Sequence, residues 1–529
     1  MISFGQGPCD EGVIRAATET ADCAARARPW VLAATILGSS MAFIDGSVVT
    51  VALPAIQAAL TMSVEGAQWV VNAYLLMLGA LILVGGSAGD RFGRRRLFAL
   101  GVAIFTGASV GCGLAPNTVA LIAARAAQGI GGALLVPGSL AIISAAFPAD
   151  ERGRAIGTWA GFSALTTALG PVLGGWLVET LSWRAIFFIN VPIALLTLGL
   201  AFRHVPESRD ALDEGTVDWP GALLAMLGLA GLAYGLTAAS DFGWRDPTVF
   251  GVLLGSGLVL ALFVWHEARA PSPMMPLGLF RSRVFSGANA MTLLLYFALS
   301  GILFFLPFNL IRIQGYSATL AGAAFLPFTL IMGGLSRWSG GLIHRYGARK
   351  PLTIGPIIVG AGSALFALPG IGGSYWTTFF PAMAVLGLGM AVSVAPLTTT
   401  VMSAAAARQA GLASGINNAI ARIAGMLAIA LLGTLAVGVF GAAIDARLAE
   451  LRVPTEIRRA VDAEVPKFAT AKVPPEIEGE QRRLLEKVLD ESFVRSFRVA
   501  MLIAAGLALA SALCAGLTIG LQRGNPPVA

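Results

Sequence analysis

Long apolar runs fill most of this 529-residue chain, and they restrict its fold more than any other feature. A helix needs about 20 consecutive apolar residues to cross the hydrocarbon core of a bilayer. About fourteen such runs can be distinguished, and only 12% of the residues are charged. Typical soluble domains have about 25% charged residues. The short alternating segments of a membrane β-barrel are absent. The sequence therefore predicts an all-α polytopic membrane protein.

The apolar runs form two groups of six around an additional pair. We expect a cytoplasmic tail at 1–29, a six-helix half at 30–202, a linker with two extra transmembrane helices at 203–266, a second six-helix half at 267–522, and a cytoplasmic tail at 523–529. The predicted spans are 30–60, 68–88, 97–115, 119–146, 154–178, 184–202, 218–238, 247–265, 285–306, 317–338, 352–369, 376–402, 411–440 and 494–521.

Basic residues are unevenly distributed over the loops between these runs. Arg91, Arg94 and Arg345 lie in alternate loops, whereas the short links 61–67 and 116–118 contain no Lys or Arg. Cytoplasmic loops carry an excess of Lys and Arg, so we expect both termini on the cytoplasmic side. The net charge of +7 arises mostly from such loops, and we expect no binding of nucleic acid.

One long polar segment, 441–493, is predicted to be an extracytoplasmic loop. Its pattern indicates amphipathic helical stretches at 446–451, 456–465 and 481–488, interrupted by prolines. The segment is either a solvated loop without a function or a hairpin over the outer mouth of a pathway.

Two charged residues lie deep inside predicted spans, where a charge is costly. Asp45 is in the middle of the first span, about 20 Å from either end at 1.5 Å per residue. We interpret it as a site that loads and releases a proton, which requires that it reach an aqueous opening. Arg125 in the fourth span needs a partner because it stays protonated, and we expect it to tune Asp45 directly or through water. The alternatives are a permanent structural ion pair for Asp45, and helix packing through backbone carbonyls for Arg125.

The first inner loop combines glycines and charges in a fixed order. Gly86 and Gly93 permit a tight turn and close approach. Asp90 suits the N-terminus of a neighbouring helix, and Arg91 and Arg94 can pair with inner-loop carboxylates. We expect this motif to gate the inner side. The alternative is a basic loop that only sets topology.

A weaker copy of this loop occurs at 340–350, with His344 in the place of Asp90. An internal repeat of this kind fits proteins in which two related halves rock about a site near the membrane midplane.

The fifth predicted span carries a motif of small residues. Gly170, Gly174 and Gly175 allow helices to touch closely, and Pro171 removes a backbone hydrogen bond and can kink the helix. The motif indicates a tightly packed, bendable helix, or generic packing of small residues.

Several amide and aromatic residues in the spans are candidates for lining a substrate cavity. Trp69, which is among them, also suits an anchor at the membrane interface. Arg422 is a further embedded charge, in the thirteenth span, and no embedded carboxylate of the second half matches it. The candidate cavity residues are Gln68, Trp69, Asn72, Tyr74, Gln128, Tyr296 and Asn417.

Patterns typical of catalytic and metal sites are absent. The chain has no Gly-x-x-x-x-Gly-Lys-Ser/Thr phosphate loop, and its four Cys and three His lack the spacing of metal ligands. We therefore expect no enzyme activity, no catalytic residues, no metal and no cofactor.

With these motifs the chain resembles the major facilitator superfamily, and within it the fourteen-span drug:proton antiporters. The resemblance covers about 30–522 and rests on the motifs around Asp45, Gly86–Arg96, Arg125–Gly132 and Gly170–Gly175. It implies a role of Arg125 in proton transfer and a bacterial inner-membrane location, and it leaves open whether a periplasmic adaptor protein is a partner. One departure is Gly46, where the family usually has Thr after the acid.

The resemblance implies export of drugs or other small amphipathic molecules by alternating access, with the proton gradient as the energy source. Two other interpretations remain open. One is an exporter of a dedicated physiological cargo, such as a fatty acid, a lipid or a biosynthetic product. The other is a membrane sensor without transport. The lack of embedded carboxylates in the second half argues against dicationic cargo.

Overall fold

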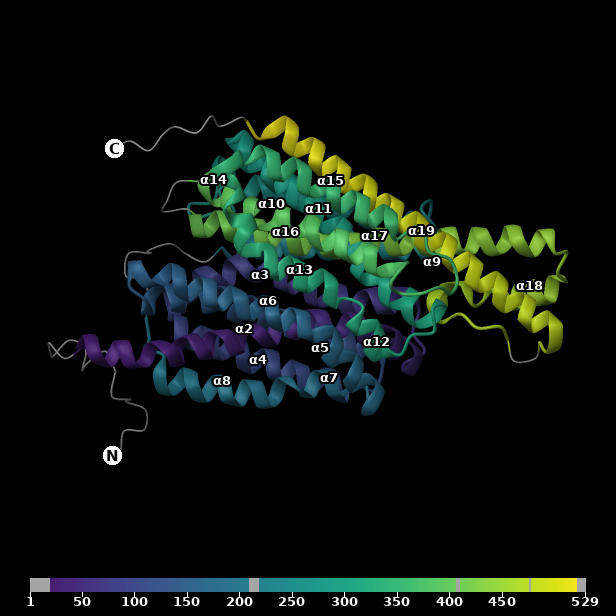
Figure 1. Cartoon of the computed structure of the whole chain (residues 1–529), viewed down its shortest axis with the longest axis horizontal. Coiled ribbons are helices and arrows are strands. Elements are labelled where there is room, and N and C mark those ends of the chain that lie inside the picture. The colour runs from purple at the N-terminus through teal and green to yellow at the C-terminus, as the bar shows by residue number, and fades with distance from the viewer. Residues whose placement is uncertain (1–19, 209–217, 406–409, 475–476, 521–529) are drawn as a thin grey trace.

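Helices are the only regular elements in the part of the chain that the structure describes, which is residues 20–208, 218–405, 410–474 and 477–520 of a computed structural model. The helices lie side by side along the long axis of the molecule (Figure 1). Large apolar side chains also face outward, for example Leu195, Leu258 and Leu513, which are 69%, 65% and 64% exposed. An apolar outer surface of this kind suits contact with lipid. The prediction of an all-α membrane protein is therefore confirmed.

Twelve helices of the described residues are long and apolar enough to cross a bilayer. The predicted spans 154–178 and 352–369 are occupied by α6 (Ala149–Thr180) and α15 (Arg349–Leu365), which are not among the twelve. A helix of 17 residues such as α15 is about 26 Å long. Fourteen spans require that α6 and α15 also cross the membrane, and this number stays a prediction.

The N-terminal half is formed by the helices from α2 to α8. Helix α2 packs on α5, α6 and α8, and α5 packs closely on α3 and α4. Glycines allow this close approach, since a Cβ on Gly131 would lie 2.5 Å from the backbone nitrogen of Phe105. Besides α6, the helices are α2 (Thr20–Ala59), α3 (Val64–Phe92), α4 (Arg94–Leu114), α5 (Thr118–Ala146), α7 (Ala185–Phe188) and α8 (Asn190–His204).

The two additional helices, α9 (Trp219–Phe242) and α10 (Pro247–Glu267), form an antiparallel pair. Helix α9 packs against α3 of the N-terminal half and also against α17 (Ala410–Glu450) of the C-terminal half. The Thr434 hydroxyl donates a hydrogen bond to the Leu236 carbonyl at 2.6 Å across this contact. The pair therefore covers the seam between the halves on one side.

The C-terminal half contains the remaining helices, in which α11 packs on α16, α17 and α19, and α16 packs on α13 and α15. Besides α15 and α17, they are η1 (Leu277–Arg281), α11 (Arg283–Phe308), η2 (Asn309–Ile313), α12 (Ala318–Ala323), α13 (Leu326–Gly340), α14 (Leu342–Tyr346), α16 (Phe379–Ser403), α18 (Thr455–Asp462), η4 (Val465–Thr470) and α19 (Gly479–Thr518).

The segment 441–493 is a helical hairpin, because α17 continues to Glu450 and α19 begins at Gly479. It projects beyond the bundle with α18 at its tip (Figure 1). At its base, Phe468 of η4 is buried among Phe305, Phe440 and Phe493. The Gln57 side chain of α2 donates a hydrogen bond to the Lys467 carbonyl at 3.1 Å, which joins η4 to the N-terminal half.

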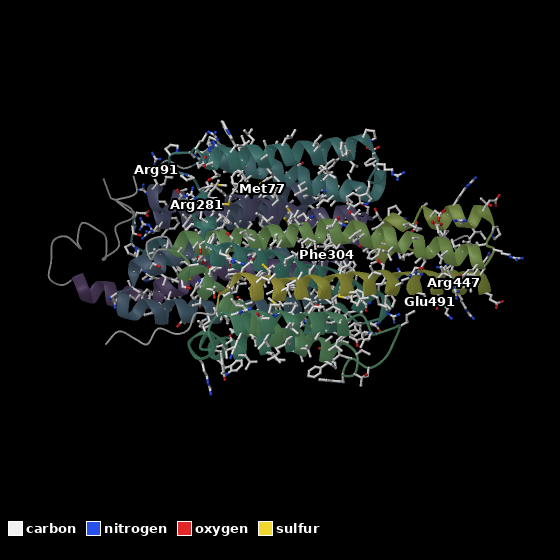
Figure 2. All side chains as sticks on the ribbon, turned by 90° about the horizontal axis from the view of Figure 1, so that it is seen from above. Met77, Arg91, Arg281, Phe304, Arg447 and Glu491 are labelled. Carbon is white, nitrogen blue, oxygen red and sulfur yellow. The ribbon has the colours of Figure 1, made fainter. Side chains whose placement is uncertain are left out.

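The two ends of the bundle differ in charge. Figure 2 shows Arg91 and Arg281 at one end and Arg447 and Glu491 on the projecting hairpin at the other. Helix α2 begins, and α19 ends, at the end that carries Arg91 (Figure 1). We refer to this end as the inner end and to the hairpin end as the outer end, following the excess of basic residues in the loops.

Candidate functional site

The carboxylate of Asp45 is buried in the middle of the N-terminal half. Helix α2 directs it toward α5, where Arg125 Nη1 lies 2.5 Å from Asp45 Oδ2. Both side chains are essentially inaccessible to solvent, at 0% and 1% exposed. A buried charge requires a close partner, and here each of the two charges supplies the other's partner.

Gln128, one turn further along α5, completes this ion pair. Its amide nitrogen donates to Asp45 Oδ1 at 2.8 Å, and its amide oxygen accepts from Arg125 Nη1 at 2.6 Å. Both carboxylate oxygens of Asp45 therefore have donors. The network continues through Ser109, which accepts from Gln128 at 3.3 Å and from Asn190 at 2.8 Å.

Arg125 is further held by α3. Its Nε donates to the Val70 carbonyl at 3.0 Å, and its guanidinium carbon lies 4.4 Å from the centre of the Tyr74 ring. This backbone contact and the ion pair to Asp45 occur together, although the sequence left them as alternatives for Arg125. The fixed, planar set of donors on Arg allows both at once.

Water does not reach Asp45 in this conformation, which differs from the expectation of an aqueous opening. The neighbouring Gly46 is exposed, and a Cβ there would meet no atom within 4 Å. An open surface therefore begins one residue from the buried acid. Asp45 therefore exchanges a proton with solvent only after the helices around it move.

The small-residue motif of α6 lies at the contact between the halves. A Cβ on Gly175 would clash with the Ala318 carbonyl, and a Cβ on Gly322 would clash with the Pro171 carbonyl. These glycines allow the backbones of α6 and α12 to touch near the outer end. Gly170 and Gly174 face Ser47 and Val48 of α2 in the same way.

A polar contact follows at the outer end of α6. The Thr319 hydroxyl and backbone N–H, both on α12, donate hydrogen bonds to the Glu179 carboxylate. Glu179 lies one residue beyond the predicted fifth span, and the Thr319 hydroxyl bond lowers its pKa below the usual range. Together with the glycine contacts, this bond holds the two halves closed on the outer side.

The inner-loop motif is anchored to the segment that follows α8. Gly93 has a φ of 110°, and a Cβ there would lie 2.6 Å from Glu207 Oε1. Glu207 accepts from the Arg95 backbone N–H at 3.1 Å, and its Oε2 lies 3.6 Å from Arg96 Nε. Sequence reasoning missed Glu207, because a single Glu in a polar linker has no distinguishing pattern.

The other members of this motif have different environments. Arg91 lies against the Phe92 ring, with 5.6 Å from the guanidinium carbon to the ring centre. The Arg94 backbone N–H donates to the Ser208 carbonyl at 3.0 Å. Gly86 faces Pro137 of α5. The side chain of Asp90 is outside the described part of the structure.

Residues 35–429 match the Major Facilitator Superfamily. The chain belongs to this superfamily. It is therefore a membrane transporter and not an enzyme.

Named relatives and solved structures agree with this assignment. The chain is 35% identical to the multidrug resistance protein Stp of Mycobacterium tuberculosis, over 89% of this chain and 88% of the relative. It is 34% identical to the tetracenomycin C resistance and export protein of Streptomyces glaucescens, over 93% and 92%. A bacterial homologue of the human lysosomal transporter Spinster shares the fold, with a TM-score of 0.66 and 18% identity over 92% of this chain and 97% of that chain.

Within this superfamily fold, the predicted cavity residues do not form one group. Gln128 and Tyr74 belong to the buried network around Arg125. Asn417 on α17 donates to Asn289 Oδ1 at 3.0 Å and to Thr292 Oγ1 at 2.6 Å, both on α11. These three polar residues connect two helices of the C-terminal half.

The remaining predicted cavity residues lie on α3 and α11. Gln68 is buried against Gly433 of α17, and Trp69 packs beside Leu229 of α9. Asn72 is fully buried, and neither of its amide atoms has a hydrogen-bond partner among the described residues. Tyr296 on α11 is half-buried.

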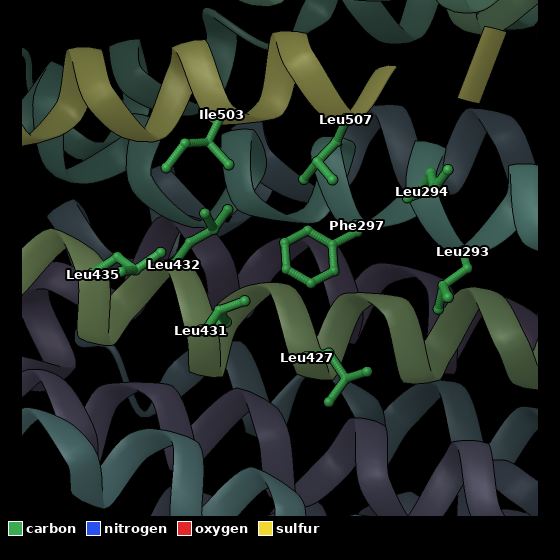
Figure 3. A pocket seen from close by; sticks show the side chains of 9 residues that line it. All are labelled: Leu293, Leu294, Phe297, Leu427, Leu431, Leu432, Leu435, Ile503 and Leu507. Atoms are coloured by element: carbon green, nitrogen blue, oxygen red, sulfur yellow. The ribbon is translucent and has the colours of Figure 1, made fainter. Parts of the chain in front are cut away.

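A pocket of about 300 Å³ lies between α11, α17 and α19 (Figure 3). None of the seven predicted cavity residues lines it. Its lining is wholly apolar, so it offers no polar group that would orient a ligand. The lining residues are Leu293, Leu294, Phe297, Leu427, Leu431, Leu432, Leu435, Ile503 and Leu507.

Proposed function

We propose that this chain exports drugs or other small amphipathic molecules in exchange for protons. The observation that carries the proposal is the buried network of Asp45, Arg125 and Gln128. The network holds one acid about halfway along α2, next to an exposed position at Gly46, and this arrangement supports proton exchange there. The resistance and export functions in the names of the relatives support drug cargo.

The network can couple a proton to substrate because it has two arrangements of different charge. With Asp45 ionised, the pair with Arg125 is closed and neutral overall. A proton on Asp45 removes the attraction and leaves Arg125 to its contacts with Gln128 and Val70. Protonation thus changes both the local charge and the packing of α2, and substrate binding that favours one arrangement is linked to the proton.

Alternating access requires that the contacts on the outer side separate. Those contacts are the glycine surfaces of α6 and α12, the bond from Thr319 to Glu179, and the bond from Gln57 to Lys467. All of them join the N-terminal half to the C-terminal half. Rocking of the halves would break them together and expose the region near Asp45 to the outside.

For the location, we propose a bacterial inner membrane with both termini in the cytoplasm. The excess of basic residues in the loops at the inner end supports this orientation. The proton gradient supplies the energy, without a bound cofactor. If an adaptor protein participates, the projecting hairpin of α17, α18 and α19 is the surface it would reach (Figure 2).

The test is efflux from an efflux-deficient host and from inside-out vesicles made from it. The proposal predicts resistance to several lipophilic compounds, and uptake into the vesicles that stops when a protonophore is added. Metabolite profiling of the same host separates drug export from a dedicated cargo. Loss of one metabolite without a change in resistance would contradict the proposal.

A further inference from the structure

Arg422 is a membrane-embedded cation without a carboxylate of its own. It lies on α17, 12 residues after the first residue of that helix, which is about 18 Å along the axis. The sequence contains no Asp or Glu between Glu267 and Asp445 and none after Glu491, so the predicted spans of the C-terminal half lack carboxylates. A charge at this depth is costly unless a partner or water compensates it.

The N-terminal half does not supply the missing partner. The acid in the middle of its spans is Asp45, and both of its carboxylate oxygens accept hydrogen bonds from Arg125 and Gln128. Among the residues that the structure describes, Arg422 makes no hydrogen bond and no ion pair. Arg125 and Arg422 are thus opposite cases, one with a full set of partners and one without.

Arg422 lies on the side of α17 that faces the other half. On α17, Gly415 and Gly433 pack against α3, while Gly425 meets Ser300 of α11. The helical repeat of 3.6 residues places Asn418, Arg422 and Ile429 on one side of α17. This side lies between the surface that contacts α3 and the surface that contacts α11.

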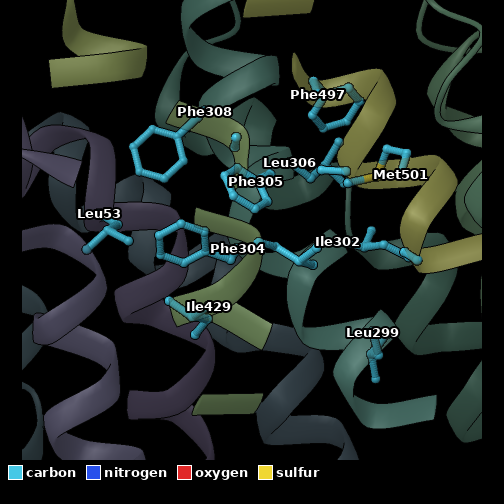
Figure 4. Close-up of a cluster of buried hydrophobic side chains, with 14 of the residues drawn as sticks. Leu53, Leu299, Ile302, Phe304, Phe305, Leu306, Phe308, Ile429, Phe497 and Met501 are labelled. Carbon is cyan, nitrogen blue, oxygen red and sulfur yellow. The ribbon is translucent and has the colours of Figure 1, made fainter. Parts of the chain in front are cut away.

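Accessibility changes along this side of the helix. Ile429, two turns further out, is 3% exposed in the apolar cluster that includes Leu53 and Phe304 (Figure 4). Asn418, one turn further in, is exposed, and Arg422 between them is half-buried. The apolar cluster therefore closes this face on the outer side, and the guanidinium group lies where the face becomes accessible.

Two tyrosines and one amide lie on the helices near this position. The hydroxyl groups of Tyr296 on α11 and Tyr74 on α3 lie within electrostatic reach of Arg422. The exposed Asn418 lies one turn away on the same side of the helix. A cation with nearby hydroxyl and amide donors is the arrangement that binds a carboxylate or a phenolate.

We propose that Arg422 binds the anionic group of the exported substrate, and that the cargo includes lipophilic weak acids. The inference rests on the proposed export function and adds a substrate class to it. The bound anion supplies the negative charge that the C-terminal half lacks, and the apolar body of the substrate extends toward Phe304 and Ile429.

The test uses a fluorescent acid and its uncharged analogue, dansylglycine and dansylglycinamide. Binding to the purified full-length protein is measured by fluorescence, and uptake into inside-out vesicles is measured with the same two compounds. The variants are Arg422→Gln, which removes the charge, and Arg422→Lys, which keeps it. Arg495→Gln is the matched control, because Arg495 is exposed on α19 and has no bonded partner among the described residues.

We expect Arg422→Gln to weaken dansylglycine binding at least about tenfold and to change dansylglycinamide binding by less than about twofold. Arg422→Lys should retain most of the affinity for the acid, and Arg495→Gln all of it. Equal affinity of the unmodified protein for both compounds, or an equal loss of both in Arg422→Gln, would overturn the inference.

The vesicle measurement separates this inference from the proposed function. Selective binding of the acid without uptake that depends on protons would refute the export mechanism and leave the anion site intact. Proton-dependent uptake of both compounds that depends equally on Arg422 would support the export mechanism and refute the anion site.

Discussion

At the scale of single residues, the structure joins two embedded charges through an amide. Gln128 contacts both Asp45 and Arg125, so neither charge can change its state without affecting a shared set of hydrogen bonds. The pairing was foreseeable from sequence, since an embedded Arg must find an acceptor and few acids were available. The position of Gln128 between them was not, because the orientation of α2 relative to α5 is set by packing.

Replacing Arg125 with Lys tests the geometry of this network. A lysine keeps the charge but cannot contact Asp45, Gln128 and the Val70 carbonyl with one planar group. We expect transport to fall at least about tenfold and its pH optimum to shift, measured as vesicle uptake against pH. A normal rate with an unchanged pH optimum would show that Arg125 does not tune Asp45.

Gly93 is a second residue whose identity is dictated by its surroundings. Its φ of 110° and its contact with Glu207 both exclude a side chain, and a residue forced into such a conformation costs about 1–3 kcal/mol. We expect Gly93→Ala to lower the thermal unfolding temperature and the transport rate. Gly89→Ala is the control, because a Cβ at Gly89 meets no atom within 4 Å. Equal behaviour of the two variants would contradict the assigned role of Gly93.

At the scale of elements, the contact between α6 and α12 explains the small-residue motif. The sequence indicated close packing around Pro171 but not the helix that provides the other surface. Gly322, which supplies that surface, lies far along the chain in a short helix. Contacts between distant segments of this kind depend on the tertiary arrangement and leave no local signal in the sequence.

Larger side chains at this contact should favour opening on the outer side. We expect Gly322→Val and Gly175→Val to separate α6 from α12, since a Cβ at either position already clashes with backbone. The measurement is labelling of Thr50→Cys, which is half-buried on α2 between Asp45 and the outer end, by an impermeant maleimide from outside, after replacement of the four native cysteines. Gly334→Val is the control, because Gly334 is exposed and a Cβ there has no neighbour within 4 Å. Labelling that stays at the level of the control would refute this role of the glycines.

At the scale of the whole molecule, the sequence predicted the membrane fold, the two halves and the inserted pair of helices from apolar runs and a repeat. The sequence did not predict the packing at the base of the outer hairpin. Phe468, which is buried between three other phenylalanines, lies between the predicted amphipathic stretches 456–465 and 481–488 and belongs to neither pattern. The missing information there is tertiary, as it is for Glu207 and Gly322.

Rocking of the halves predicts opposite distance changes at the two ends of the bundle. Spin labels at Val119 and Trp376 report on the outer end, and labels at Phe92 and Tyr346 report on the inner end. All four positions are exposed, at 76%, 68%, 51% and 47%. When the transporter turns outward, we expect the outer distance to increase and the inner distance to decrease. Changes of the same sign at both ends would contradict alternating access.

The central claim is that Asp45 carries the exchanged proton. The direct measurement is proton movement in proteoliposomes that contain a pH-sensitive dye, recorded when a lipophilic substrate is added. The unmodified protein should give a proton flux that depends on substrate. The Asp45→Asn protein should still bind substrate but give no such flux. A flux of normal size from Asp45→Asn would contradict the account.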